Sequence, residues 1–109
     1  MKDLIYVCSP YSGTEEEVKE NVKRARDHCR LITQHGCIPI APHTYFTEFM
    51  DDTAPEERQI GIDCGLALLE ICGEMHVLGD RVSDGMKAEI RYAEKLKIPI
   101  LYVGGAASD

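Results

Sequence analysis

Short apolar runs alternate with longer amphipathic stretches along most of the 109 residues, and this alternation limits the fold more than any other feature. The runs are rich in β-branched residues and are shorter than an ordinary helix. Apolar runs of this kind are typical of strands that are buried on both faces of a parallel sheet. The sequence therefore predicts an α/β protein in which strands and helices follow one another in turn.

Four runs are expected to form strands, over residues 4–8, 37–41, 74–78 and 98–103. The second run contains Pro39, which cannot donate to a ladder and therefore favours an edge position. Right-handed crossovers would place helices on both faces of the sheet. The predicted architecture is a flavodoxin- or Rossmann-like three-layer sandwich with four parallel strands in the order 2-1-3-4.

The first and third helices have clear limits in the sequence. Thr14 and Glu17 form the pattern of a capping box, and Gly36 is typical of the residue that follows a helix. The third helix is expected from Ser83 to about Lys97. Between the second strand and the second helix, residues 42–52 are expected to form an aromatic-rich loop or irregular turn.

The second helix is expected to begin at another capping box, formed by Thr53 and Glu56, and to continue to about Ile71. Its apolar side chains surround nearly the whole circumference: Ile60, Ile62, Leu66, Leu68, Leu69 and Ile71. A helix that is apolar on all sides is expected to be buried on all sides. In a domain this small, part of that burial would come from a second subunit, so we expect at least a dimer.

Length and composition indicate one soluble domain over residues 1–109. No apolar run approaches the roughly 18 residues of a membrane span. A strand-like run begins directly after the N-terminus, which predicts no signal peptide. The five cysteines are an odd number and form no C-x-x-C pair, so a reducing cytoplasmic location is expected.

Two classes of partner are disfavoured by the same data. A net charge of −7 argues against a nucleic-acid polymer, which needs a basic surface. No pair of cysteine or histidine residues has the spacing of a zinc site, so no metal is expected. A small phosphorylated ligand at one local site remains compatible with this charge.

The segment 83–89, Ser-Asp-Gly-Met-Lys-Ala-Glu, joins the third strand to the third helix. Free backbone N–H groups and the positive end of the helix dipole at such a junction favour an anion, phosphate in particular. Ser83 adds a hydroxyl donor, and Gly85 allows a ligand to approach the backbone. Glu89 falls within the apolar stripe of the helix, so it is either paired, protonated or functional, or it reaches solvent at the edge of that stripe.

Ligands of such sheets bind beyond the carboxyl ends of the strands, at the point where the strand order reverses. Ser9, Tyr11 and Gly13 follow the first strand, and His43 follows the second. Each of these residues is individually compatible with an ordinary turn or loop. Asp63 interrupts the apolar second helix and is either a second functional acid or a residue at its solvent edge.

The sequence contains no P-loop, no dinucleotide fingerprint and no nucleophile elbow. No cofactor is expected. A carboxylate beside an anion site can act as a nucleophile at the anomeric carbon of a sugar, where an oxocarbenium-like transition state favours nearby negative charge. Asp63 could assist as a second acid or hold the sugar.

These motifs resemble the nucleoside 2-deoxyribosyltransferase-like superfamily, which includes the deoxynucleoside 5′-monophosphate N-glycosidases and short uncharacterised members. The resemblance rests on the run Cys8-Ser9-Pro10-Tyr11, on Asp63, and on Ser83-x-Gly85-x-x-x-Glu89. It implies that Glu89 is the nucleophile, that Asp63 orients the substrate and that Ser83 contacts a 5′-phosphate. Arg91 departs from the small residue that is usual in this superfamily, and the chain is shorter than typical transferases.

The expected function is that of an N-glycosidase or deoxyribosyl transferase acting on a small-molecule nucleoside or its 5′-monophosphate, with hydrolysis slightly favoured by Ser83. The expected catalytic residues are Glu89 and Asp63. The expected substrate-binding residues share the carboxyl edge of the sheet: Ser9, Tyr11, Gly13, His43, Ser83 and Gly85. The alternatives are a non-catalytic nucleotide-binding or regulatory module and, with less support, an oligomerisation domain.

Overall fold

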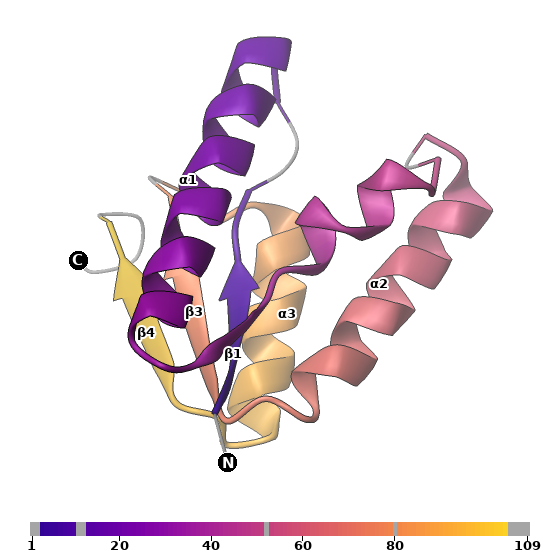
Figure 1. Cartoon of the computed structure of the whole chain (residues 1–109). Coiled ribbons are helices and arrows are strands. Elements are labelled where there is room, and N and C mark those ends of the chain that lie inside the picture. The colour runs from indigo at the N-terminus through magenta and orange to yellow at the C-terminus, as the bar shows by residue number, and fades with distance from the viewer. Residues whose placement is uncertain (1–2, 11–12, 52, 80, 105–109) are drawn as a thin grey trace.

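The computed structural model describes residues 3–10, 13–51, 53–79 and 81–104 (Figure 1). Within these residues one sheet contains the strands β1 (Leu4–Cys8), β2 (Ile38–Ile40), β3 (Glu74–Leu78) and β4 (Ile100–Val103). All of its pairings are parallel, and the strand order is β2-β1-β3-β4. The predicted α/β class, parallel sheet and strand order are confirmed, and β2 with its Pro39 lies at an edge.

Helices cover both faces of this sheet. The helix α1 (Glu15–Gln34) lies on one face, and α2 (Pro55–Leu69) and α3 (Asp84–Lys95) lie on the other (Figure 1). The alternation along β1 divides the core, because Ile5 and Val7 pack toward α1 while Tyr6 and Cys8 pack toward α3. Two short 3₁₀ helices, η1 (Pro42–Thr44) and η2 (Phe46–Glu48), connect β2 to α2.

The starts of α1 and α3 follow their local sequence. Thr14 Oγ1 accepts from the Glu17 N–H at 3.2 Å, and the Thr14 N–H donates to Glu17 Oε1 at 3.0 Å, so the predicted capping box is confirmed. Ser83 Oγ accepts from the Met86 N–H at 3.3 Å and caps α3. The helix α3 therefore begins directly after Ser83, as expected.

The predicted capping box at the start of α2 is wrong. The residue that precedes the helix is Ala54, which has no capping side chain, and Pro55 occupies the first turn. The Thr53 hydroxyl instead donates to Asp51 Oδ1 at 2.5 Å. A proline is favoured at the first helical position, and the aspartate turn competes for the threonine, so the capping pattern is not used.

In the single chain α2 is buried on one side only, and the expected burial of its other side by a second subunit stays a prediction. The helix ends at Leu69, and only Gly65 and Leu69 are buried. Ile60 and Ile62 of α2 and Ile71 just after it are 53%, 42% and 61% exposed, because α3 and η1 pack against only one side of the helix.

The carboxyl ends of β1 and β3 approach each other closely. Gly79, directly after β3, has a φ of +105°, and a Cβ at this position would lie 2.9 Å from Pro10 Cγ. Only glycine fits this backbone conformation and this contact without strain. Within the described part of the chain, no helix is both long and apolar enough to cross a membrane.

Candidate functional site

A cavity of about 660 Å³ opens beyond the carboxyl ends of β1 and β2, between α2 and the start of α3. Its walls come from the segments that follow β1, β2 and β3 and from the facing sides of both helices. This is the part of a parallel sheet at which ligands of α/β proteins bind.

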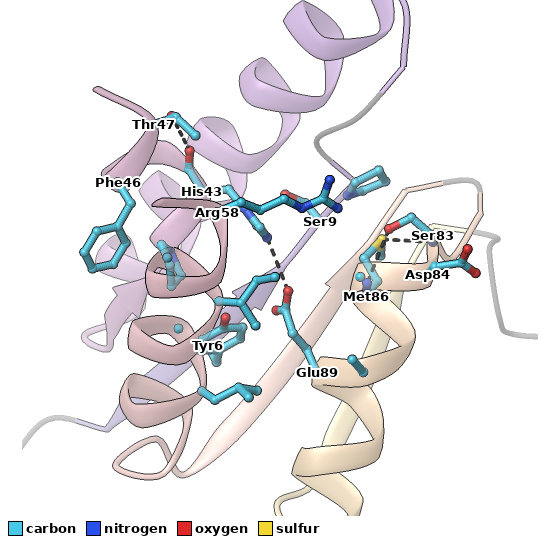
Figure 2. A pocket seen from close by; sticks show the side chains of 18 of the residues that line it. Tyr6, Ser9, His43, Phe46, Thr47, Arg58, Ser83, Asp84, Met86 and Glu89 are labelled. Carbon is cyan, nitrogen blue, oxygen red and sulfur yellow. Dashed lines mark hydrogen bonds and ion pairs between the residues drawn. The ribbon is translucent and has the colours of Figure 1, made fainter. Parts of the chain in front are cut away.

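The cavity brings together most of the residues that the sequence singled out. Ser9, His43, Ser83, Gly85 and Glu89 all line it (Figure 2). They come from three strand ends and one helix, so their proximity depends on the order of the strands.

Of the other expected site residues, Asp63 and Gly13 do not belong to this group. Asp63 lies on the exposed side of α2, where its Oδ1 accepts a hydrogen bond from Gln59 Nε2 at 2.9 Å. Gly13 precedes α1 and lies beside Glu17, away from the cavity lining. Tyr11 lies outside the described residues.

Glu89 occupies the second turn of α3, and its side chain is only 12% exposed. Its Oε1 lies 3.3 Å from His43 Nε2 (Figure 2). Its Oε2 is buried and has no hydrogen-bond partner among the described residues. A buried carboxylate oxygen without a partner is costly, and such a group in a cavity is typical of a functional site.

Two further polar groups lie beside Glu89 on the sheet. Burial raises the pKa of the Tyr6 hydroxyl and of the Cys8 thiol, and the charge of Glu89 raises both further. Both groups therefore keep their protons at neutral pH and can donate to the carboxylate.

Gly65 allows α2 to pack over Tyr6. A Cβ on Gly65 would lie 3.1 Å from the Tyr6 hydroxyl oxygen, and Gly65 itself lines the cavity. Tyr6 and Gly65 were not singled out from the sequence, and Cys8 was named only as part of the run Cys8-Ser9-Pro10-Tyr11. The alternation along β1 places Tyr6 and Cys8 on one face of the sheet, but it does not say which helix covers that face.

One side of the cavity is suited to an anion. The start of α3 contributes Ser83, whose hydroxyl accepts from Met86 N–H and keeps its own proton for a ligand. At Gly85, a Cβ would meet no atom within 4 Å. Arg58 and Arg81 also line the cavity, and Figure 2 shows Arg58 extending from α2 toward the side where α3 begins. Neither arginine was singled out from the sequence.

The side of the cavity near η2 is apolar. Phe46, Met50 and Ile62 contribute apolar side chains to the cavity. The Phe46 ring packs edge-on against Tyr45, with ring centroids 5.1 Å apart. A flat heterocyclic ring would find an apolar contact surface here.

The described residues contain no group of three histidine, cysteine or acidic side chains placed to hold a metal ion. What the cavity does hold is a buried carboxylate and an imidazole at 3.3 Å, with basic groups and a helix N-terminus in the same walls. This arrangement can present a nucleophile, a proton donor and an anion-binding side to one ligand.

A similar fold occurs in a solved structure of a 2-deoxyribosyltransferase from the psychrotolerant bacterium Bacillus psychrosaccharolyticus. The TM-score is 0.76 at 17% sequence identity, and the match covers 97% of this chain and 75% of that chain. At this identity the likeness shows the fold alone. No curated protein matches the sequence significantly. A family model described as "Domain of unknown function (DUF7768)" matches residues 3–103.

Proposed function

The chain belongs to the DUF7768 family of domains of unknown function, and we propose that it cleaves the N-glycosidic bond of a nucleoside or its 5′-monophosphate, with Glu89 as nucleophile. The observation that carries this proposal is the environment of the Glu89 carboxylate. It is buried at a cavity wall, and one of its oxygens lacks a partner among the described residues. The likeness of the fold to a 2-deoxyribosyltransferase is compatible with the same chemistry.

The proposed reaction proceeds in two steps. A Glu89 oxygen attacks the anomeric carbon as the bond to the base breaks, and the base nitrogen takes the electron pair. This leaves a glycosyl ester on the enzyme. Water, or a second base in a transfer reaction, then attacks the same carbon and regenerates the carboxylate. The chemistry requires no cofactor.

The two sides of the cavity suit the two ends of such a substrate. Ser83, Gly85 and the start of α3 would hold the 5′ end, and Arg58 and Arg81 would favour a phosphate there. The apolar side chains near η2 would contact the base. We propose hydrolysis ahead of transfer because a phosphate site favours a nucleotide as the substrate.

Asp63 has no step in this mechanism, because its side chain lies outside the cavity in the single chain. The same observation favours the second candidate function, a nucleotide-binding or regulatory module that does not turn its ligand over. Such a module would keep the anion side and the apolar side of the cavity and would not need Glu89 as a nucleophile.

The test is the release of free base from a panel of ribo- and deoxyribonucleosides and their 5′-monophosphates. The wild type is compared with Glu89→Gln and with Glu94→Gln, a matched change at an exposed position of the same helix. The proposal expects base release by the wild type and by Glu94→Gln, and a loss on the order of 10³-fold or more in Glu89→Gln. Nucleotide binding without turnover by the wild type would favour the module instead.

We also propose that the chain is a single domain that works as at least a dimer in a reducing cytoplasmic compartment. An apolar stripe at helical spacing follows the outer side of α2 and the residues just after it: Ile60, the half-buried Cys64, Ala67 and Ile71. A second copy of the chain would cover this stripe. Sedimentation of the wild type beside Ile60→Glu tests this, since the variant should be monomeric if the stripe is the interface.

A further inference from the structure

His43 lines the cavity and contacts the proposed nucleophile, Glu89. It is the middle residue of η1, where the Tyr45 N–H donates to the Pro42 carbonyl at 3.0 Å. The Thr47 hydroxyl donates to the His43 carbonyl at 2.7 Å. The backbone is therefore anchored on both sides of a side chain that is 36% exposed and lines the cavity.

The contact between His43 and Glu89 defines the position of one proton. An ionised carboxylate only accepts hydrogen bonds, so the proton in the 3.3 Å contact belongs to Nε2 of the imidazole. The ring therefore presents an N–H at the wall of the cavity, next to the atom that would attack the sugar. The negative charge of Glu89 favours a hydrogen-bond donor on this nitrogen.

Attack by Glu89 on the sugar would remove the negative charge that faces the imidazole. The carboxylate loses its negative charge when it becomes an ester, and the imidazolium beside it becomes a stronger acid. In the same step the leaving base gains an electron pair on its nitrogen and becomes a stronger proton acceptor. The two changes favour transfer of a proton from His43 to the base.

We propose that His43 is the general acid and then the general base of this reaction. In the first step the Glu89 oxygen bonds to the anomeric carbon, the bond from that carbon to the base breaks, and Nε2 of His43 gives its proton to the base nitrogen. In the second step neutral His43 takes a proton from water while the water oxygen bonds to the anomeric carbon. The ester bond breaks toward Glu89, and both residues return to their starting states.

This inference rests on the proposed glycosidase function and assigns to His43 the acid role that Asp63 was considered for in the sequence. Other ionisable groups line the same cavity on the elements around His43: Tyr6, Glu57, Arg58, Arg81 and Asp84. The ring of His43 pairs with the Glu89 carboxylate at 3.3 Å.

Comparing two substrates with different leaving groups distinguishes an acid role of His43 from a merely structural one. Release of a natural base needs a proton, whereas 4-nitrophenolate leaves a 4-nitrophenyl 2-deoxyriboside, or its 5′-phosphate, without one. In a single turnover, His43→Gln should slow release of the natural base by roughly 10²–10⁴-fold and leave nitrophenolate release within about tenfold of the wild type. Glu89→Gln should lose both reactions.

The second step gives an independent readout. His43→Gln should release one equivalent of 4-nitrophenolate rapidly and then turn over slowly, because no base activates water. Azide, which needs no general base, should restore the slow phase. His35→Gln is the matched control, since His35 lies at the exposed end of α1 and bonds to the Leu31 carbonyl.

The outcomes distinguish this inference from the function on which it rests. Equal losses for both leaving groups in His43→Gln and His43→Asn would overturn the acid role and leave the glycosidase intact. Turnover of no substrate by the wild type would overturn both. Should the variants fail to fold, the wild type alone decides the question. Its single-turnover rate should fall at alkaline pH for the natural base and stay level for the nitrophenyl substrate, and identical profiles would overturn the inference.

Discussion

Two histidine–carboxylate pairs lie on opposite faces of the sheet, and their environments are reversed. In the cavity, His43 Nε2 lies 3.3 Å from Glu89 Oε1, and the carboxylate is the more buried member, at 12% against 36% exposure. On the α1 face, His76 Nε2 lies 2.5 Å from Glu74 Oε2, and the histidine is the more buried member, at 10% against 43%.

The second pair also has a third member. His28 Nε2 of α1 lies 2.8 Å from His76 Nδ1, so both ring nitrogens of His76 are engaged. This chain connects α1 to β3. Glu89, by contrast, keeps one buried oxygen without a partner among the described residues. A fully satisfied polar network rigidifies a core, whereas an incompletely satisfied one beside a cavity is available to a ligand.

The largest effect should come from removing the centre of the satisfied network. His76→Ala leaves His28 and Glu74 without their partner and opens space in the core, so the free energy of unfolding should fall by about 2–4 kcal/mol. His43→Ala should cost less than about 1 kcal/mol, because its side chain already borders a cavity. Urea denaturation of both variants measures the difference, and equal losses would contradict the contrast between the two pairs.

A smaller effect on stability is expected where α2 packs over Tyr6, beside His43 and Glu89. Gly65→Ala would bring a methyl group to 3.1 Å from the Tyr6 hydroxyl, so we expect a loss of about 1–3 kcal/mol. Gly61→Ala is the control on the same helix, where a Cβ meets no atom within 4 Å. That change should stabilise the protein by about 0.5–1 kcal/mol through helix propensity. Thermal melting of the two variants should shift in opposite directions, and a shared direction would argue against the close contact with Tyr6.

Removing the charge of Glu89 should increase stability. Glu89→Gln keeps an oxygen that can accept from His43 and relieves the burial of an incompletely paired carboxylate, so a gain of about 0.5–2 kcal/mol is expected. Glu74→Gln weakens a charged hydrogen bond and should not stabilise the protein. A loss of stability in Glu89→Gln, measured by urea denaturation, would show that the ion pair with His43 outweighs the cost of burial.

The smallest expected effect is a pH dependence of stability that comes from His28, on the α1 face of the sheet. Burial, and then the charge of His76, lower the pKa of His28 below its ordinary value of 6.5. The unfolded state then binds more protons than the folded state just below pH 6.5, so stability should fall as the pH drops through this range and should be fully present above it. For one proton the slope cannot exceed about 1.4 kcal/mol per pH unit, and partial exposure of His28 should reduce it.

His28→Gln provides the comparison for that pH dependence. The variant should show a flatter profile of melting temperature below pH 6.5 than the wild type. An unchanged profile would mean that His28 does not contribute to it. The carboxylates of Glu17 and Asp51, whose pKa values are lowered by hydrogen bonds, titrate at more acidic pH and should affect both proteins alike.

Local patterns predicted most of the fold because they encode local structure. Thr14 with Glu17 set the start of α1, and Pro39 set an edge strand. The failure at Thr53 was also local, since Pro55 and Asp51 offered competing arrangements within a few residues. Tyr6 and Arg58 were missed because neither residue departs from its local pattern, and only the packing of α2 brings them to the cavity.

The sequence by itself determined the order of the elements, the parallel sheet and the placement of Ser83 and Glu89 at one edge of it. Hydrophobic periodicity and turn residues carry that information within each segment. The tertiary structure alone decided how α2 is rotated, with Gly65 against Tyr6 and Asp63 in solvent, because a helix that is apolar all round does not specify its buried side. It also decided that Glu89 meets His43, a partner 46 residues away, since such a contact depends on packing between elements.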